Sequence, residues 1–226
     1  MCQSFSLKCK CTPKTKPTGY LFILKCLYLR GKMKMESRME QLKIAIIRHG
    51  KPSSVSNDVV DALGFEKWVQ AYDLSDVDTR SLPPLELQLE LEKSYSISSD
   101  LNRALHSARL CANKNADCIL KELREFEIPC FRWPFRLSIG KWLLFSRLAW
   151  YMNIVGKSES RRVGHARLRK AVDLIEEKSL EQPNIAIFGH GLANRFIAAE
   201  LKRRGWTVAS SGSGYWGTIR LVKALS

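Results

Sequence analysis

Two short runs of apolar, mostly β-branched residues constrain this chain more than any other feature. They are "IAII" at 44–47 and "IAIF" at 185–188. Unbroken apolar runs of this length are typical of strands that are buried on both faces, as in a parallel sheet. Each run leads into a His-Gly pair, at 49–50 and at 190–191. The chain must therefore cover both faces of a sheet, and it places an imidazole at the end of two buried strands.

The segments between and around these runs predict an α/β fold. Apolar residues with helical spacing alternate with short strand-like stretches, which favours a mostly parallel central sheet with helices on both faces. Helices are expected over 57–76, 85–94, 101–116, 159–179 and 192–205, and further strands over 95–100, within 117–125 and over 217–225. A Ser99 or Asp100 side chain is expected to cap the helix at 101–116.

The ends of the two buried strands are the expected functional edge. Ligands of open α/β sheets bind beyond the carboxyl ends of the strands, so neighbouring strands would bring His49 and His190 together. The segment "SSDLNRALHSA" at 98–108 adds Arg103 in the first turn of a helix. A cation there is unfavourable unless an anion lies nearby, and guanidinium groups bind phosphate in a bidentate way. Together with Arg48, these side chains predict a cationic pocket for one phosphoryl group.

Three motifs, in their order and strand context, resemble the histidine phosphatase superfamily, which includes the cofactor-dependent phosphoglycerate mutases. They are "RHG" at 48–50, "SSxLxRAxxSA" at 98–108 and "GHG" at 189–191. The resemblance covers 42–226 and implies a phosphoglycerate mutase-like fold. A looser match is "LREFEIP" at 123–129, where the family often has an acidic residue after a short strand.

The resemblance also implies site residues. His49 would be the nucleophile that forms a phosphohistidine, and a hydrogen bond from the Gly50 backbone would orient its ring. The resemblance assigns the phosphoryl oxygens to Arg48, Arg103 and His190, a substrate-binding role to Gly50 and Asn57, and the general acid to Glu125, with Glu127 as the reserve. The positive groups would repel a cation, and no His/Cys/Asp cluster has metal-ligand spacing, so no metal and no cofactor are expected.

The chain departs from the family pattern in two places. "RSLPPLELQLEL" stands where the family has a Gln-Ala helix, which alters the expected pocket wall. The segment 131–156 is rich in aromatic residues, and in the family this segment contributes to the cover over the site. An aromatic cover argues against the doubly charged substrate of a phosphoglycerate mutase. The alternative, which we favour, is that Trp142, Phe145 and Trp150 form the core face of a helix.

A metal-independent phosphatase acting on phosphomonoesters is thus the predicted function. The alternatives are a phosphoglycerate mutase-type phosphotransferase and a non-catalytic module that binds a phosphorylated ligand. The expected partner is a phosphorylated small molecule or a phosphoprotein. The net charge of +15 favours anionic partners, but no specific nucleic acid is predicted, because basic and aromatic residues are not interleaved as on an exposed binding sheet.

The first 41 residues form a separate basic segment ahead of a catalytic domain at 42–226. They hold nine Lys/Arg against two Asp/Glu. Three interpretations stay open: a weak contact with an anionic membrane surface, a disordered or loosely helical extension, or a non-native stretch ahead of a translation start such as Met39. Seven cysteines without a disulfide framework predict reduced thiols and a cytoplasmic protein.

Overall fold

A computed structural model describes residues 41–54 and 56–225 of the 226-residue chain. The basic segment therefore lies outside the described residues, except for Gln41, which begins the first strand. The interpretations of that segment stay predictions. Among the helices of the described residues, none is long and apolar enough to cross a membrane.

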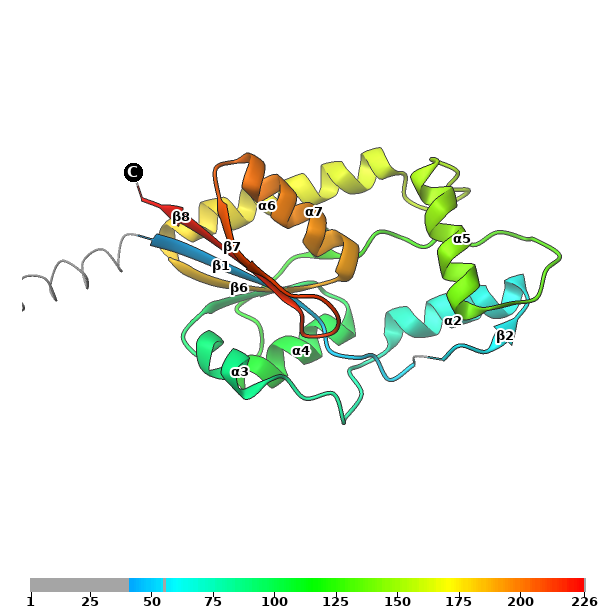
Figure 1. Cartoon of the computed structure of the whole chain (residues 1–226), viewed down its shortest axis with the longest axis horizontal. Helices are drawn as coiled ribbons and strands as arrows, with labels where there is room; N and C mark the ends of the chain where they lie inside the picture. Colours follow the sequence, from blue (N-terminus) through cyan, green and yellow to red (C-terminus); the bar gives the residue numbers. More distant parts are fainter. Residues whose placement is uncertain (1–40, 55, 226) are drawn as a thin grey trace, which may run out of the picture. The chain divides into compact units, whose positions relative to one another are not determined.

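A six-stranded sheet with the order β4-β3-β6-β1-β8-β7 forms the centre of the domain (Figure 1). The first four strands in this order run parallel, and β8 and β7 continue the sheet in antiparallel pairs. Its strands are β1 (Gln41–Arg48), β3 (Tyr95–Ser98), β4 (Cys118–Ile119), β6 (Asn184–Gly189), β7 (Thr207–Ser211) and β8 (Thr218–Ala224). The predicted mostly parallel sheet is confirmed.

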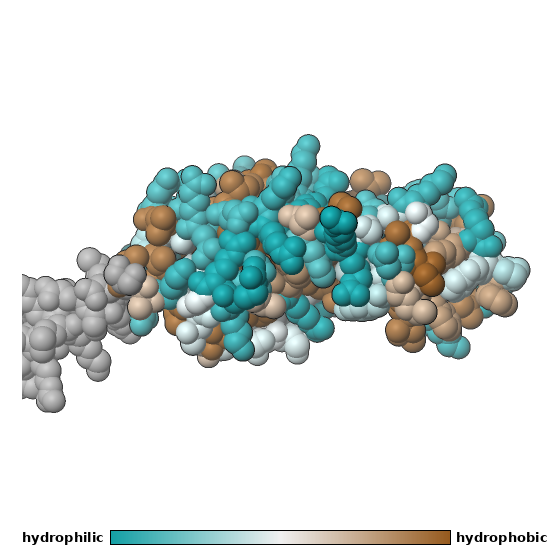
Figure 2. Space-filling model, turned by 90° about the horizontal axis from the view of Figure 1, so that it is seen from above, coloured by the Kyte–Doolittle hydropathy of each residue, from teal (hydrophilic) through white to brown (hydrophobic). Residues whose placement is uncertain are grey.

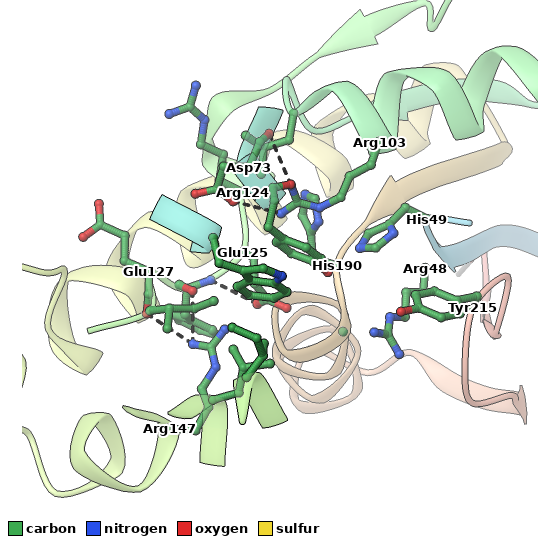
Figure 3. A pocket seen from close by; sticks show the side chains of 18 of the residues that line it. Arg48, His49, Asp73, Arg103, Arg124, Glu125, Glu127, Arg147, His190 and Tyr215 are labelled. Atoms are coloured by element: carbon green, nitrogen blue, oxygen red, sulfur yellow. Dashed lines mark hydrogen bonds and ion pairs between the residues drawn. The ribbon is translucent and has the colours of Figure 1, made fainter. Parts of the chain in front are cut away.

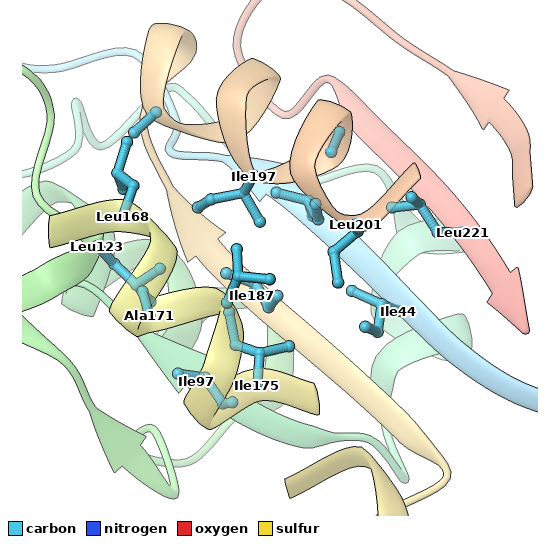
Figure 4. Packing of buried hydrophobic residues seen from close by; sticks show 14 of the residues in the cluster. Ile44, Ile97, Leu123, Leu168, Ala171, Ile175, Ile187, Ile197, Leu201 and Leu221 are labelled. Atoms are coloured by element: carbon cyan, nitrogen blue, oxygen red, sulfur yellow. The ribbon is translucent and has the colours of Figure 1, made fainter. Parts of the chain in front are cut away.

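Helices cover both faces of this sheet, as predicted (Figure 1). On one face lie α6 (Arg161–Glu181) and α7 (Gly191–Arg203), and on the other lie α3 (Leu85–Leu91) and α4 (Asn102–Ala112). Side chains that alternate along β1 enter the two cores in turn. Ile44 and Ile46 belong to the core under α6 and α7, in which Figure 4 labels Ile44, and Ala45 and Ile47 belong to the core on the opposite side. Burying an isoleucine contributes about 1.5–3 kcal/mol, so this strand anchors both layers.

A smaller layer lies beyond the carboxyl ends of the parallel strands and is called the cap here (Figure 1). It consists of α2 (Ala62–Leu74), α5 (Ile139–Tyr151) and the two-stranded sheet of β2 (Val59–Val60) with β5 (Leu137–Ser138). Its core is separate from those of the sheet and centres on Phe65, Ile139 and Trp142. The Trp142 indole Nε1 donates a hydrogen bond to the carbonyl oxygen of Val60, at 3.0 Å, which joins α5 to β2.

The aromatic residues of α5 follow the favoured core interpretation only in part. Trp142 and Trp150 are buried, whereas Phe145 is 42% exposed and contacts Trp133 instead. None of these three helix aromatics lines the cavity described below. The exposed side of α5 also carries Leu144 and Leu148, with Met152 directly after the helix, and hydrophobic side chains lie at the surface of this end of the domain (Figure 2).

The predicted cap of α4 is wrong. Leu101 precedes the helix and makes no side-chain cap. The two expected capping side chains have other partners: Ser99 Oγ lies 3.0 Å from His190 Nε2, and Asp100 holds the guanidinium group of Arg124 through two contacts of 2.6 Å. Strand β7 was also not predicted, because all five of its residues are exposed and carry no buried pattern.

Candidate active site

His49 follows β1 at the carboxyl edge of the sheet and is 2% exposed. Its backbone N–H donates to the Gly189 carbonyl at 3.0 Å, which ties the ends of β1 and β6 together. Its ring Nδ1 lies 2.7 Å from the Gly50 carbonyl oxygen. A carbonyl oxygen only accepts, so Nδ1 carries the proton and Nε2 keeps its lone pair. The predicted Gly50 contact is present, with the ring as the donor and the backbone as the acceptor.

Gly50 is held at a place where a larger residue does not fit. A Cβ atom at this position would lie 2.5 Å from the Trp216 ring and 2.7 Å from Val77. The Gly50 N–H donates to Ser107 Oγ at 2.9 Å, and this hydroxyl donates to the Arg103 carbonyl at 2.7 Å. The His49 turn is therefore fixed to α4, the helix that carries Arg103.

Burial keeps the His49 imidazole neutral. It lowers the pKa of His49 from 6.5 to about 3, although the Gly50 hydrogen bond acts in the opposite direction. Arg103 and Arg48 lower the pKa further. Desolvation is a larger cause of this shift than the neighbouring cations. A neutral imidazole with a free Nε2 is the nucleophilic form.

His190 lies beside His49, with ring centroids 5.2 Å apart. The register of the strands explains this contact. Arg48 of β1 pairs with Gly189 of β6, so the residues that follow, His49 and His190, lie side by side at the edge of the sheet. The predicted adjacency of the two histidines is confirmed. His190 is 1% exposed, and burial, followed by the charge of Arg103, holds its pKa well below 6.5.

Two tyrosines that the sequence reasoning missed position the arginines. Arg103 stands over the Tyr72 ring at 4.5 Å and donates to the Tyr72 carbonyl at 2.8 Å, and it also pairs with Asp73 at 3.3 Å. Arg48 stands over the Tyr215 ring at 4.7 Å. Stacking on an aromatic ring orients a guanidinium group without occupying its N–H donors. Tyr215 comes from the β7–β8 loop, whose position depends on β7, the edge strand that the sequence analysis did not predict.

Three buried nitrogen atoms at this edge have no hydrogen-bond partner among the described residues: Arg48 Nε, Arg103 Nε and His190 Nδ1. Figure 3 shows His49 between Arg48 and Arg103, with His190 next to it. Buried donors are almost always paired in folded proteins. The two arginine Nε–H groups are donors, and His190 Nδ1 is a third donor in the tautomer whose Nε2 accepts from Ser99 Oγ, so these nitrogens suit a ligand with several acceptor oxygens, as a phosphoryl group has.

Glu125 lies at the N-terminus of α7, on the other side of Gly191 from Arg48. Its carboxylate accepts hydrogen bonds from the N–H groups of Leu192 at 2.9 Å and Ala193 at 3.0 Å. A carboxylate is favourable at the positive end of a helix, so this contact fixes the side chain in place. The predicted acid is thus brought to the same cavity as the histidines.

Arg167 in α6 holds the loop that carries Glu125. Its Nη1 donates to the carbonyls of Glu122 at 2.6 Å and Arg124 at 2.9 Å, and its Nε and Nη2 donate to the two carboxylate oxygens of Glu159 at 2.8 Å. The sequence analysis predicted a helix over 159–179 but no role for Arg167. A loop without regular structure gave no signal that a distant arginine would fix it.

Glu127 and Asn57 reach the same cavity, but both side chains are already bonded. Glu127 Oε2 accepts from the Glu159 N–H at 2.6 Å, and Figure 3 shows its carboxylate far from His49. Asn57 Oδ1 accepts from the Gly140 N–H at 2.9 Å and so links the segment before β2 to α5. Neither side chain is placed among the unpaired nitrogens.

The site opens into a cavity of about 530 Å³ between the sheet edge and the cap. This volume is in the ordinary range for a small-molecule site. Its lining includes the five predicted catalytic residues, Arg48, His49, Arg103, Glu125 and His190. Within 41–54 and 56–225, no group of three or more His, Cys, Asp or Glu side chains could hold a metal ion.

Comparisons with known proteins show the family to which the chain belongs. Residues 85–211, more than half of the chain, match the model of the histidine phosphatase superfamily (branch 1). The match begins after the Arg48-His49-Gly50 motif. No curated protein matches the sequence.

Solved structures show the same fold at low sequence identity. Mycobacterial hydrolase 1 is 18% identical, with 80% of this chain and 92% of that chain covered and a TM-score of 0.54. The phosphoglycerate mutase of Bacillus anthracis strain Sterne is 17% identical, with 82% and 89% covered and a TM-score of 0.53. The fold is phosphoglycerate mutase-like, and the chain belongs to the histidine phosphatase superfamily.

Proposed function

We propose that this protein is a metal-independent phosphatase that hydrolyses phosphomonoesters through a phosphohistidine on His49. The observation that carries the proposal is the neutral His49 imidazole surrounded by the unpaired nitrogens of Arg48, Arg103 and His190. These groups supply a nucleophile and donors for the non-bridging oxygens, whose charge must be stabilised throughout phosphoryl transfer. The positive charges would also take over the role that a divalent cation plays in other phosphatases.

In the first step, His49 Nε2 would attack the phosphorus atom, and the bond from phosphorus to the ester oxygen would break. The departing oxygen keeps the electron pair and takes a proton, which protonated Glu125 would supply. The phosphorylated ring gains positive charge, and its Nδ1–H already donates to the Gly50 carbonyl oxygen. That hydrogen bond becomes stronger as the charge develops.

In the second step, water would attack the phosphorus atom and the bond to Nε2 would break, which returns the electron pair to the ring. The Glu125 carboxylate would take the proton from the attacking water and regain the protonated form. Atoms and charges balance over the two steps: one ester and one water give one alcohol and one phosphate. Splitting the displacement in this way replaces one difficult step by two easier ones.

The test is phosphate release from an alkyl phosphate in the presence of a chelator. We expect wild-type turnover under these conditions and a loss of several orders of magnitude for His49→Ala. A phosphoprotein that is labile in acid and stable in alkali should accumulate briefly in the wild type. Turnover that stops with the chelator and returns with a divalent ion would contradict the metal-independent assignment. Full activity of His49→Ala would contradict the nucleophile.

A mutase-type phosphotransferase would use the same first step. It would return the phosphoryl group from His49 to a second hydroxyl of the substrate rather than to water. Product analysis separates the two: a phosphatase releases inorganic phosphate in an amount equal to the substrate consumed. A non-catalytic binding module would bind phosphate and release none.

A further inference from the structure

The cavity is much larger than the phosphoryl group that its inner end would bind. Arg48, His49, Arg103 and His190 occupy that end, at the edge of the sheet. A water molecule fills about 30 Å³ of liquid, so a cavity of about 530 Å³ has room for a leaving group many heavy atoms in size. The outer part of the cavity should therefore determine which alcohol the ester carries.

The outer wall is largely apolar and comes from the cap and from the loop after Glu125. Its apolar part consists of the side chains of Trp68, Tyr72, Phe126, Ile128, Ile139 and Leu143, and polar or charged side chains such as Asp73, Arg124 and Arg147 complete the wall. Trp68 and Tyr72 stack on each other, with ring centroids 5.0 Å apart, and present a flat aromatic wall. An aliphatic surface from Ile139 and Leu143 of α5 completes this part of the lining.

The charged groups of the outer wall are already engaged. Arg124 donates through Nε and Nη2 to the two carboxylate oxygens of Asp100 at 2.6 Å, and Asp73 pairs with Arg103 at 3.3 Å. Arg147 donates through Nη1 to the carbonyls of Phe126 at 3.1 Å and Glu127 at 3.2 Å. A second charged group on the substrate would have to compete with these contacts.

The wall also disfavours charge through burial. Burial lowers the pKa of Arg147 and raises the pKa of the Tyr72 phenol, and in both groups it is the largest cause of the shift. Both directions are those expected where water is excluded; the Tyr72 phenol stays neutral, and Arg147 keeps its charge, which faces the carbonyl oxygens of Phe126 and Glu127. An apolar, flat group placed here would lose little by leaving water.

We propose that the outer cavity selects phosphate esters of apolar alcohols that carry an aromatic ring or a similar flat group. The proposal deepens the phosphatase assignment and rests on the phosphate end of the site. The ester oxygen would lie between His49 and Glu125, and the apolar part would lie between the Trp68–Tyr72 wall and Leu143. Burying such a group is worth a preference on the order of 10- to 100-fold over an ester that lacks it.

The test measures binding and does not depend on turnover. Phosphonates carry a carbon in place of the ester oxygen, so they bind as substrate mimics and are not cleaved. The affinities of methylphosphonate, benzylphosphonate and 3-phosphonopropionate would be measured by calorimetry on the unmodified chain. We expect benzylphosphonate to bind about 10- to 100-fold more tightly than methylphosphonate. We expect the carboxylate of 3-phosphonopropionate to give no gain.

A matched pair of variants on adjacent residues of α5 locates the effect. Leu143 lines the cavity, whereas Leu144 is 57% exposed. Leu143→Ala should reduce the benzylphosphonate preference about tenfold and leave methylphosphonate binding unchanged, which also shows that the variant is folded. Leu144→Ala should leave both affinities unchanged.

Equal affinities of benzylphosphonate and methylphosphonate would overturn the proposal, and so would tighter binding of the carboxylate compound. Absence of binding by all three would overturn both the selectivity and the phosphate site. A benzylphosphonate preference without any ester hydrolysis would support the selectivity and contradict only the phosphatase assignment. The two failures are therefore distinguishable.

Discussion

The burial of His49 predicts a pH dependence of folding stability that can be measured directly. The folded pKa of about 3 lies below the ordinary value of 6.5, so the folded state favours the neutral ring. As the pH falls, the unfolded chain takes up the proton first. The stability that this histidine contributes is therefore fully present above about pH 6.5 and is lost between about pH 6.5 and about pH 3.

The magnitude follows from the two pKa values. At about pH 7.5 both states are almost entirely neutral, and the contribution differs from its maximum by less than about 0.1 kcal/mol. At about pH 5 the unfolded ring is mostly protonated and the folded ring is not. The ratio of their binding polynomials is about 30, which corresponds to a loss of about 2 kcal/mol in the free energy of unfolding.

The assay compares the wild type with His49→Asn by urea unfolding at these two pH values, in buffers without phosphate. Asparagine is chosen because its side-chain N–H can donate to the Gly50 carbonyl in place of Nδ1. Differences between the proteins cancel the contributions of all other titrating groups, including that of His190. The wild type should lose about 2 kcal/mol more than the variant between the two pH values. A difference below about 0.5 kcal/mol would show that His49 titrates as in an unfolded chain and would refute the burial argument.

Three further predictions follow from the site. Glu125→Gln should reduce kcat/KM on an alkyl phosphate by about 10²–10⁴-fold and leave kcat/KM on an aryl phosphate unchanged, because an aryl alcohol leaves without a proton. Glu127→Gln should leave kcat/KM on both esters nearly unchanged. Equal losses on the two esters for Glu125→Gln would argue against its role as the general acid. Ser99→Ala should raise KM for phosphate esters about tenfold through loss of the hydroxyl that contacts His190, with recovery in Ser99→Thr, and an unchanged KM would remove that role. Gly50→Ala should lower the free energy of unfolding by about 1–3 kcal/mol in urea titrations. A variant as stable as the wild type would show that the turn accommodates a Cβ atom without strain.

The inner end of the site could be predicted because it depends on strong local patterns. A continuous apolar run of β-branched residues has few alternatives to a buried strand, and parallel strands end at the same edge of a sheet. These two rules place His49 and His190 at one edge of the sheet, and the pairing of β1 with β6 makes them neighbours. The direction of the Gly50 hydrogen bond could not be predicted in this way, because it depends on which backbone atom the turn presents.

The outer part of the site could not be predicted for a different reason. Helical spacing of aromatic residues tells that a face is buried but does not tell which layer covers it. Phe145 was expected in the core and is 42% exposed, while Trp68 and Tyr72, which were not singled out, form a wall of the cavity. The choice between Glu125 and Glu127 likewise depends on a loop that Arg167 fixes from a distant helix.

The separation of the cores has a consequence for how specificity can change in this fold. The catalytic groups extend from the sheet and from α4 and α7, whose packing involves the two large cores. The apolar wall belongs mainly to the cap, which packs around Phe65, Ile139 and Trp142 in a core of its own. Substitutions in the cap can therefore reshape the outer cavity while the register of β1 and β6 keeps His49 beside His190. Of the two places where the sequence departs from the family pattern, 131–156 contains β5 and α5 of the cap. The other, 80–91, contains α3, packs through Leu87 and Leu91 into the core with Ala45 and Ile47, and does not line the cavity, so the expectation that it alters the pocket wall is wrong.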